Sequence, residues 1–153
     1  MQNRDAKSTQ SVLFLCTGNY YRSRFAEILF NWHAAQRGIA WQADSRGLAI
    51  DACNLGPISQ HTIAHLKSRG IASDTCTRPP VSLTESDLVN ADRVIAVKER
   101  EHRPLMERKF PAWQDRVEYW HVDDIDCATP DVAIPHLERE VVALLERLTR
   151  LAA

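Results

Sequence analysis

The sequence of 153 residues has no long apolar run. No stretch approaches the roughly 20 residues that are needed to cross a bilayer, so we expect no membrane partner. Residues 1–10 are polar and lack the apolar stretch of a signal peptide, and we expect them to form a flexible lead-in. The formal net charge is −1, which gives no positive excess for binding nucleic acid. These absences predict a cytoplasmic protein without nucleic-acid or membrane partners.

Closely spaced cysteines are also missing, because the four cysteines are scattered along the chain, at Cys16, Cys53, Cys76 and Cys127. Without a C-x-x-C pair a zinc knuckle is not expected, and in the cytoplasm the thiols should be reduced. His61 and His65 stand four residues apart, a spacing that metal ligands use on a helix, but no third ligand accompanies them. We therefore expect no metal and no cofactor.

Short apolar segments alternate with amphipathic ones along the chain. Strands are predicted at residues 12–15, 41–45, 93–97 and 117–122. One predicted helix follows the first strand and ends at Arg37, before Gly38; others cover residues 57–69, 83–89 and 98–109, and the last starts near Pro135. The charged run at residues 98–103 is expected to be a solvated helix face. Four strand–helix alternations favour an α/β fold in which helices cover both faces of a parallel sheet, as one domain over residues 11–153.

One stretch combines a nucleophile, a tight loop and a cation. The first predicted strand ends at Cys16, and Arg22 and Ser23 follow where the first helix begins. A helix N-terminus points unpaired N–H groups and partial positive charge into such a loop, and successive backbone N–H groups can form an anion nest. Arg22 can hold two oxygens of a dianion, while the same positive field favours the reactive thiolate form of cysteine. The stretch predicts cysteine-dependent chemistry on a phosphate-like group.

An acidic loop follows the fourth predicted strand, at residues 123–130. In open parallel sheets ligands bind at the carboxyl ends of the strands, so this loop and the cysteine loop should share one rim. A carboxylic acid at that rim could protonate a leaving oxygen. The candidates are Asp123, Asp124 and Asp126, and the pattern alone leaves the choice open.

The sequence resembles the low-molecular-weight protein tyrosine phosphatases. The resemblance rests on the C-x5-R-S loop of residues 16–23 near the N-terminus, and on residues 25–27, 45–47, 91–92 and 120–124, which follow in the family's order. It implies that residues 11–153 form a low-molecular-weight phosphatase-like domain. The implied fold is a flavodoxin-like three-layer sandwich with a four-stranded parallel sheet, and the implied activity is metal-free hydrolysis of phosphate monoesters.

The same resemblance implies roles for individual residues. Cys16 would be the nucleophile that forms a cysteinyl-phosphate, and Arg22 would bind the phosphoryl oxygens. Asp124 falls on the catalytic acid when the family pattern is followed from residue 120. Asn19 would brace the loop and Ser23 would donate a hydrogen bond to the thiolate. The residues of the loop that would bind the substrate phosphate are Thr17, Gly18, Asn19, Tyr20, Tyr21 and Ser23.

Two departures from the family pattern concern the substrate. The family's acid is usually followed by proline and then by aromatic residues, whereas Ile125 and Asp126 follow Asp124 here. The aromatic wall that sandwiches a phosphotyrosine ring is therefore missing on that side. Tyr20 and Tyr21 could replace it by stacking on a substrate ring, or one of them packs beneath the loop.

We expect a monomeric phosphatase that acts on a phosphotyrosine protein or a small aryl phosphate. Arsenate reductase of the same fold is an alternative, but it needs two further cysteines, and residues 98–111 contain none while Cys76 and Cys127 are isolated. A phosphate-binding or phosphoprotein-binding module with vestigial activity is a third reading, supported by the missing proline and aromatic residues. Cys127 is either a partner that resolves oxidised Cys16 through a disulfide or an ordinary cysteine.

Overall fold

A computed structural model describes residues 9–73 and 78–152. Of the lead-in predicted at residues 1–10, residues 1–8 lie outside this description, and Gln10 is already the first residue of a strand. Cys76 also lies outside the described residues. In the part of the chain that is described, no helix is both long enough and apolar enough to cross a membrane.

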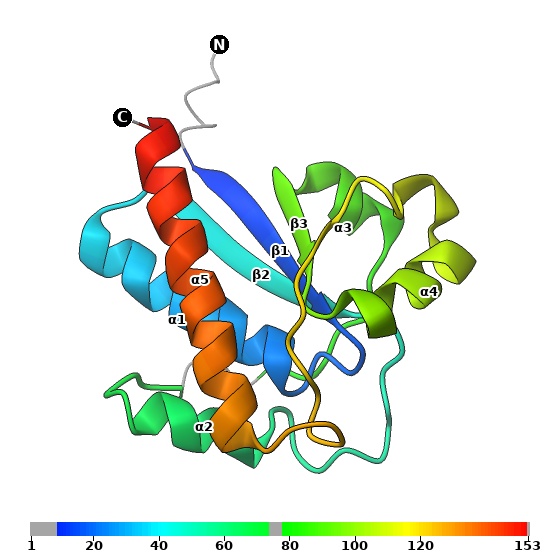
Figure 1. Ribbon diagram of the computed structural model, residues 1–153, viewed down its shortest axis with the longest axis horizontal. Helices are drawn as coiled ribbons and strands as arrows, with labels where there is room; N and C mark the ends of the chain where they lie inside the picture. Colours follow the sequence, from blue (N-terminus) through cyan, green and yellow to red (C-terminus); the bar gives the residue numbers. More distant parts are fainter. Residues whose placement is uncertain (1–8, 74–77, 153) are drawn as a thin grey trace.

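Four parallel strands form one sheet in the order β2-β1-β3-β4 (Figure 1). Their bounds are Gln10–Cys16 for β1, Trp41–Gly47 for β2, Arg93–Ala96 for β3 and Glu118–Tyr119 for β4. Strand β1 lies inside the sheet and pairs with β2 along its whole length, so that Cys16 stands opposite Gly47. β4 is shorter than the predicted strand over residues 117–122, although the N–H groups of Trp120 and Val122 still donate to the carbonyls of Ala96 and Val97.

Helices cover both faces of the sheet (Figure 1). Helices α1 (Arg22–Arg37) and α5 (Pro130–Ala152) pack on one face, beside α2 (Gln60–Lys67). Helices α3 (Glu85–Asn90) and α4 (Glu99–Lys109) pack on the other, and a 3-10 turn over Pro111–Trp113 follows α4. The three layers confirm the predicted flavodoxin-like α/β fold.

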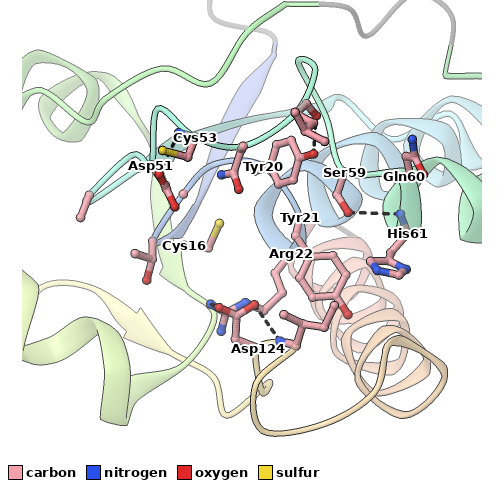
Figure 2. Close-up of a pocket in the computed structure, with 16 residues that line it drawn as sticks. Cys16, Tyr20, Tyr21, Arg22, Asp51, Cys53, Ser59, Gln60, His61 and Asp124 are labelled. Carbon is pink, nitrogen blue, oxygen red and sulfur yellow. Dashed lines mark hydrogen bonds and ion pairs between the residues drawn. The ribbon is translucent and has the colours of Figure 1, made fainter.

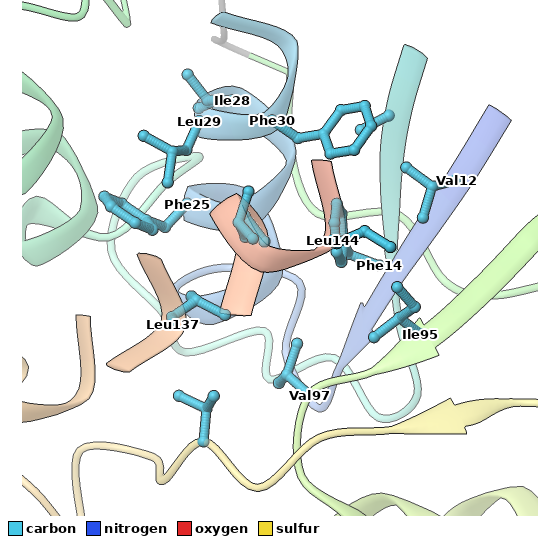
Figure 3. Packing of buried hydrophobic residues seen from close by; sticks show 14 of the residues in the cluster. Val12, Phe14, Phe25, Ile28, Leu29, Phe30, Ile95, Val97, Leu137 and Leu144 are labelled. Atoms are coloured by element: carbon cyan, nitrogen blue, oxygen red, sulfur yellow. The ribbon is translucent and has the colours of Figure 1, made fainter. Parts of the chain in front are cut away.

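Strand β1 is apolar from residue 12 to residue 16, where both of its faces are buried. Val12 and Phe14 point into the core that α1 and α5 cover (Figure 3). In this core the ring centroids of Phe14 and Trp120 are 5.7 Å apart. Leu13 and Leu15 point to the opposite core, under α3 and α4. This double burial fixes β1 firmly, so the loop that leaves its carboxyl end starts from a rigid support.

Several element ends differ from the prediction. Helix α2 begins at Gln60 instead of Pro57, because the Ser59 side chain caps it by accepting from the His61 N–H at 3.1 Å. Helix α5 begins at Pro130 instead of near Pro135, since a proline suits the first turn and its own N–H is not needed there. The predicted end of α1 is confirmed, with Gly38 left-handed at φ 65°.

Candidate active site

The carboxyl end of β1 opens into a pocket of about 590 Å³ (Figure 2). Cys16 ends β1 and Arg22 begins α1, so the loop between them joins a strand end to a helix N-terminus, as the sequence predicted. Other walls come from the segment after β2, from the start of α2 and from the acidic loop. A pocket of this size accommodates a small ligand or one side chain of a larger substrate.

Seven of the nine predicted site residues line this pocket, and the other two, Asn19 and Ser23, are buried. Among the three candidate acids only Asp124 lines it. Asp123 instead forms an ion pair with Lys98 at 2.8 Å. The lining residues that had been predicted are Cys16, Thr17, Gly18, Tyr20, Tyr21, Arg22 and Asp124.

The Arg22 side chain is only 2% exposed and is held by fixed acceptors. Its Nη1 donates to the Val122 carbonyl at 3.0 Å, and its Nη2 donates to Glu101 Oε2 at 2.8 Å and lies 3.4 Å from Asp124 Oδ2. Nε is buried and has no partner among the described residues. Burial opposes the charge, but Cys16, Glu101 and Asp124 together raise the pKa of Arg22 above its usual value. The pocket therefore has a fixed cation with an unused donor.

Cys16 is buried, and its sulfur lies 3.0 Å from Ser23 Oγ. Asn19 Nδ2 donates to Ser23 Oγ at 2.9 Å and to Ser45 Oγ at 2.9 Å. Because Ser23 Oγ accepts from the amide, its own hydroxyl hydrogen is free to point at the sulfur. This arrangement places a hydroxyl group that can donate a hydrogen bond directly beside the Cys16 sulfur.

Asn19 anchors the loop from behind in a left-handed backbone conformation, with φ 50°. Its Oδ1 accepts from the Val81 N–H and from Arg78 Nη1, both at 3.0 Å. Behind it, the Ser45 hydroxyl donates to Glu27 at 2.6 Å. The sequence predicted a bracing role for Asn19 but did not identify Arg78, Val81 or Glu27 as its support.

The charged run at residues 98–103 is not a purely solvated face, and this corrects the prediction. Glu101 Oε2 accepts from the hydroxyl of Thr17 as well as from Arg22. His102 is fully buried beside them, and its Nδ1 accepts from the Lys98 N–H at 3.1 Å. Only one signal in the sequence pointed here: α4 follows the carboxyl end of β3, which lies at the same rim.

The acidic loop is held without the family's proline. Lys98 pairs with Asp123, and the Ile125 N–H donates to Asp124 Oδ1 at 2.8 Å. The Cys127 N–H donates to the Asp124 carbonyl at 3.0 Å, which closes a turn around the acid. These contacts leave Asp124 Oδ2 on the side of the pocket that faces Arg22.

The two loop tyrosines line different parts of the pocket. The Tyr20 hydroxyl donates to the Leu55 carbonyl, so its ring lies along the wall (Figure 2). Tyr21 is 7% exposed, and its ring lies edge-on to His61 with centroids 6.2 Å apart. Burial and the charge of Asp124 raise the pKa of Tyr21 to about 12, so it stays neutral. Tyr21 therefore packs into the wall, and Tyr20 presents the more accessible ring.

Two further predictions concern a disulfide partner for Cys16 and a histidine pair with the spacing of metal ligands. Cys53 lines the pocket, whereas Cys127 is exposed outside its lining, with its sulfur 3.6 Å from Lys98 Nζ. His65 pairs with Asp131 at 3.2 Å. Within residues 9–73 and 78–152, no three side chains of the metal-binding types gather as a ligand set.

Comparisons with known proteins identify the family. The model of the low molecular weight phosphotyrosine protein phosphatase family matches residues 11–150. A low molecular weight protein tyrosine phosphatase from T. tengcongensis is 28% identical, with a TM-score of 0.73, over 93% of this chain and 99% of that one.

Two further solved structures share the fold. YfkJ from Bacillus subtilis is 24% identical, with a TM-score of 0.80, over 95% of this chain and 98% of that one. The YwlE arginine phosphatase from Geobacillus stearothermophilus is 22% identical, with a TM-score of 0.74, over 92% and 94%. No curated protein matches the chain. The family match covers nearly the whole domain, and the chain belongs to the low molecular weight phosphotyrosine protein phosphatases, a family of cysteine-based phosphatases.

Proposed function

We propose that this protein hydrolyses phosphotyrosine or aryl phosphate monoesters through a cysteinyl-phosphate intermediate. The observation that carries the proposal is the convergence of Cys16, Arg22 and Asp124 on one pocket at the end of β1. The buried sulfur has a hydroxyl donor, Ser23, at 3.0 Å, and the guanidinium keeps a donor without a partner among the described residues. These features match the needs of a nucleophile, an oxyanion site and an acid.

In the first step the Cys16 thiolate attacks phosphorus. The sulfur–phosphorus bond forms while the bond from phosphorus to the aryl oxygen breaks, and Asp124 gives its proton to that oxygen. Charge on the transferring group is stabilised by the loop N–H groups and by Arg22, which are already in place before the reaction. The loop and the arginine should therefore supply most of the rate enhancement.

In the second step a water molecule attacks the cysteinyl-phosphate. The Asp124 carboxylate takes a proton from the water, the sulfur–phosphorus bond breaks, and inorganic phosphate leaves. The electron pair returns to Cys16 as the thiolate, which Ser23 stabilises by its hydrogen bond. Each turnover thus restores both residues to their starting protonation states.

The pocket wall supports an aromatic leaving group. The ring of Tyr20 lies along one side, and Leu55 and Ile125 line the pocket with exposed apolar side chains. A phenyl ring that enters between them loses contact with water on both faces, which favours its binding. These residues give the pocket an apolar wall in a chain that lacks the family's usual aromatic pair after the acid.

The test is turnover of p-nitrophenyl phosphate, a phosphotyrosine peptide and a phosphoarginine peptide by the wild type and three variants. We expect Cys16→Ser to abolish turnover and Asp124→Asn to reduce it. Cys127→Ser is the matched control and should keep wild-type activity. Full activity of Cys16→Ser would sink the proposal, and turnover of phosphoarginine alone would overturn the substrate class.

A further inference from the structure

Glu101 connects the two ends of the cysteine loop, the segment from Cys16 to Arg22. One oxygen of its carboxylate, Oε2, accepts from the hydroxyl of Thr17 and from Arg22 Nη2 at 2.8 Å. Thr17 directly follows the nucleophile, and Arg22 closes the loop where α1 begins. Helix α4 thus reaches across the rim of the sheet, and a single acceptor atom ties both ends of the loop to it.

The position of this carboxylate is itself set by a buried histidine. His102 Nδ1 accepts from the Lys98 N–H, so the ring hydrogen of the neutral imidazole belongs on Nε2. Nε2 lies 3.1 Å from Thr17 Oγ1 and 3.3 Å from Glu101 Oε2. Burial, the largest effect, lowers the pKa of His102, which keeps the ring neutral. The hydrogen bonds therefore run in one direction, from His102 to Thr17 and from Thr17 to Glu101.

This arrangement determines which edge of Arg22 is left for a ligand. Nη1 is used by the Val122 carbonyl, and Nη2 is used by Glu101. Nε is buried without a partner among the described residues, and it shares an edge of the guanidinium with Nη2. That edge is the one that can bind two oxygens side by side. With Nη1 and Nη2 held from outside, the guanidinium cannot rotate away from this orientation without breaking both contacts.

We propose that Glu101, held by His102, is a positioning residue that aims the Nε edge of Arg22 at the transferring phosphoryl group. The inference rests on the proposed function. A carboxylate close to an anion site also repels the anion, so a purely electrostatic role for Glu101 would hinder binding. The benefit of Glu101 is therefore geometric. The orientation of Arg22 should depend on an acceptor oxygen at residue 101 more than on the negative charge of the carboxylate.

The test compares Glu101→Ala with Glu101→Gln in the full chain, on p-nitrophenyl phosphate. We expect the alanine variant to lose about 10- to 100-fold in kcat because Arg22 loses its orientation, while KM changes less than about threefold. The glutamine variant keeps an acceptor oxygen and should stay within about threefold of the wild-type kcat. Glu99→Gln is the matched control, because Glu99 lies on the same helix but pairs with Arg103 at 2.8 Å.

A kcat for Glu101→Ala within about twofold of the wild type would overturn the inference, and so would equal losses in the alanine and glutamine variants.

A second readout does not depend on turnover. The NMR signal of the Arg22 Nε–H, assigned by its loss in Arg22→Lys, should shift when inorganic phosphate is added to the wild type and broaden in Glu101→Ala. An unchanged signal in Glu101→Ala overturns the positioning role. An inactive wild type whose signal still responds in this way overturns only the proposed function and supports the positioning of Arg22.

Discussion

Replacing Asn19 with alanine should remove the central support of the cysteine loop. The side chain is fully buried and takes part in four hydrogen bonds within the described residues. It donates to Ser23 and Ser45, and it accepts from the Val81 N–H and from Arg78. Alanine leaves these groups to find other partners in a site that has little room for water, so the loss should be larger than at a surface position.

The magnitude follows from the geometry. Four hydrogen bonds at about 0.5–1.5 kcal/mol each would contribute about 2–6 kcal/mol to the free energy of unfolding. Asn19 also has a φ of 50°, a conformation that asparagine tolerates and that costs alanine about 1 kcal/mol. We therefore expect Asn19→Ala to lower the free energy of unfolding by about 5 kcal/mol, a large part of a typical total of about 5–15 kcal/mol. Asn19→Gly loses the same bonds without the backbone strain, so it should be about 1 kcal/mol less destabilised.

Urea unfolding followed by tryptophan fluorescence measures these differences, since the chain has four tryptophans. Asn90→Ala is a suitable control because Asn90 is exposed at the end of α3, and it should change the free energy by under about 0.5 kcal/mol. A loss below about 1 kcal/mol in Asn19→Ala would refute the reasoning about its buried hydrogen bonds. A glycine variant less stable than the alanine variant would refute the backbone argument.

Three further predictions concern the loop and its acid. Gly47→Ala places a Cβ 3.0 Å from the Thr17 carbonyl oxygen, so the free energy of unfolding should fall by about 1–3 kcal/mol in urea titrations. A neutral effect would show that the loop can shift freely. Asp124→Asn should lower kcat on phenyl phosphate by about 10²–10⁴-fold and on p-nitrophenyl phosphate much less, because the better leaving group needs no proton. Equal losses on both substrates would contradict a role as general acid. Lys98→Met removes the partner of Asp123 and should lower kcat on phenyl phosphate about tenfold, with under about 1 kcal/mol lost in stability. An unchanged kcat would show that the ion pair does not hold the acidic loop.

The sequence alone determined the local part of the site. An apolar run ends in Cys16, and after five intervening residues Arg22 opens an amphipathic segment. This pattern predicts a cysteine at a strand end and an arginine at a helix start, which is where the structure has them. The end of α1 was also predictable, because Gly38 adopts the left-handed conformation that often ends a helix and that few other residues adopt. The start of α2 was less predictable, because both Pro57 and the capping residue Ser59 are suitable helix-start signals, and the structure uses Ser59.

The tertiary structure alone decided which distant groups complete the loop. Glu101 meets Thr17 and Arg22 across 84 and 79 residues of sequence, and Asn19 meets Val81 across 62. Hydrophobic periodicity records which face of a segment is buried, but it does not record which polar ends then come together at the sheet rim. Those meetings follow from the strand order and from helices packing on opposite faces. Of the three candidate acids in the acidic loop they place Asp124 in the pocket lining, and they bring part of the charged run at residues 98–103 into contact with the cysteine loop.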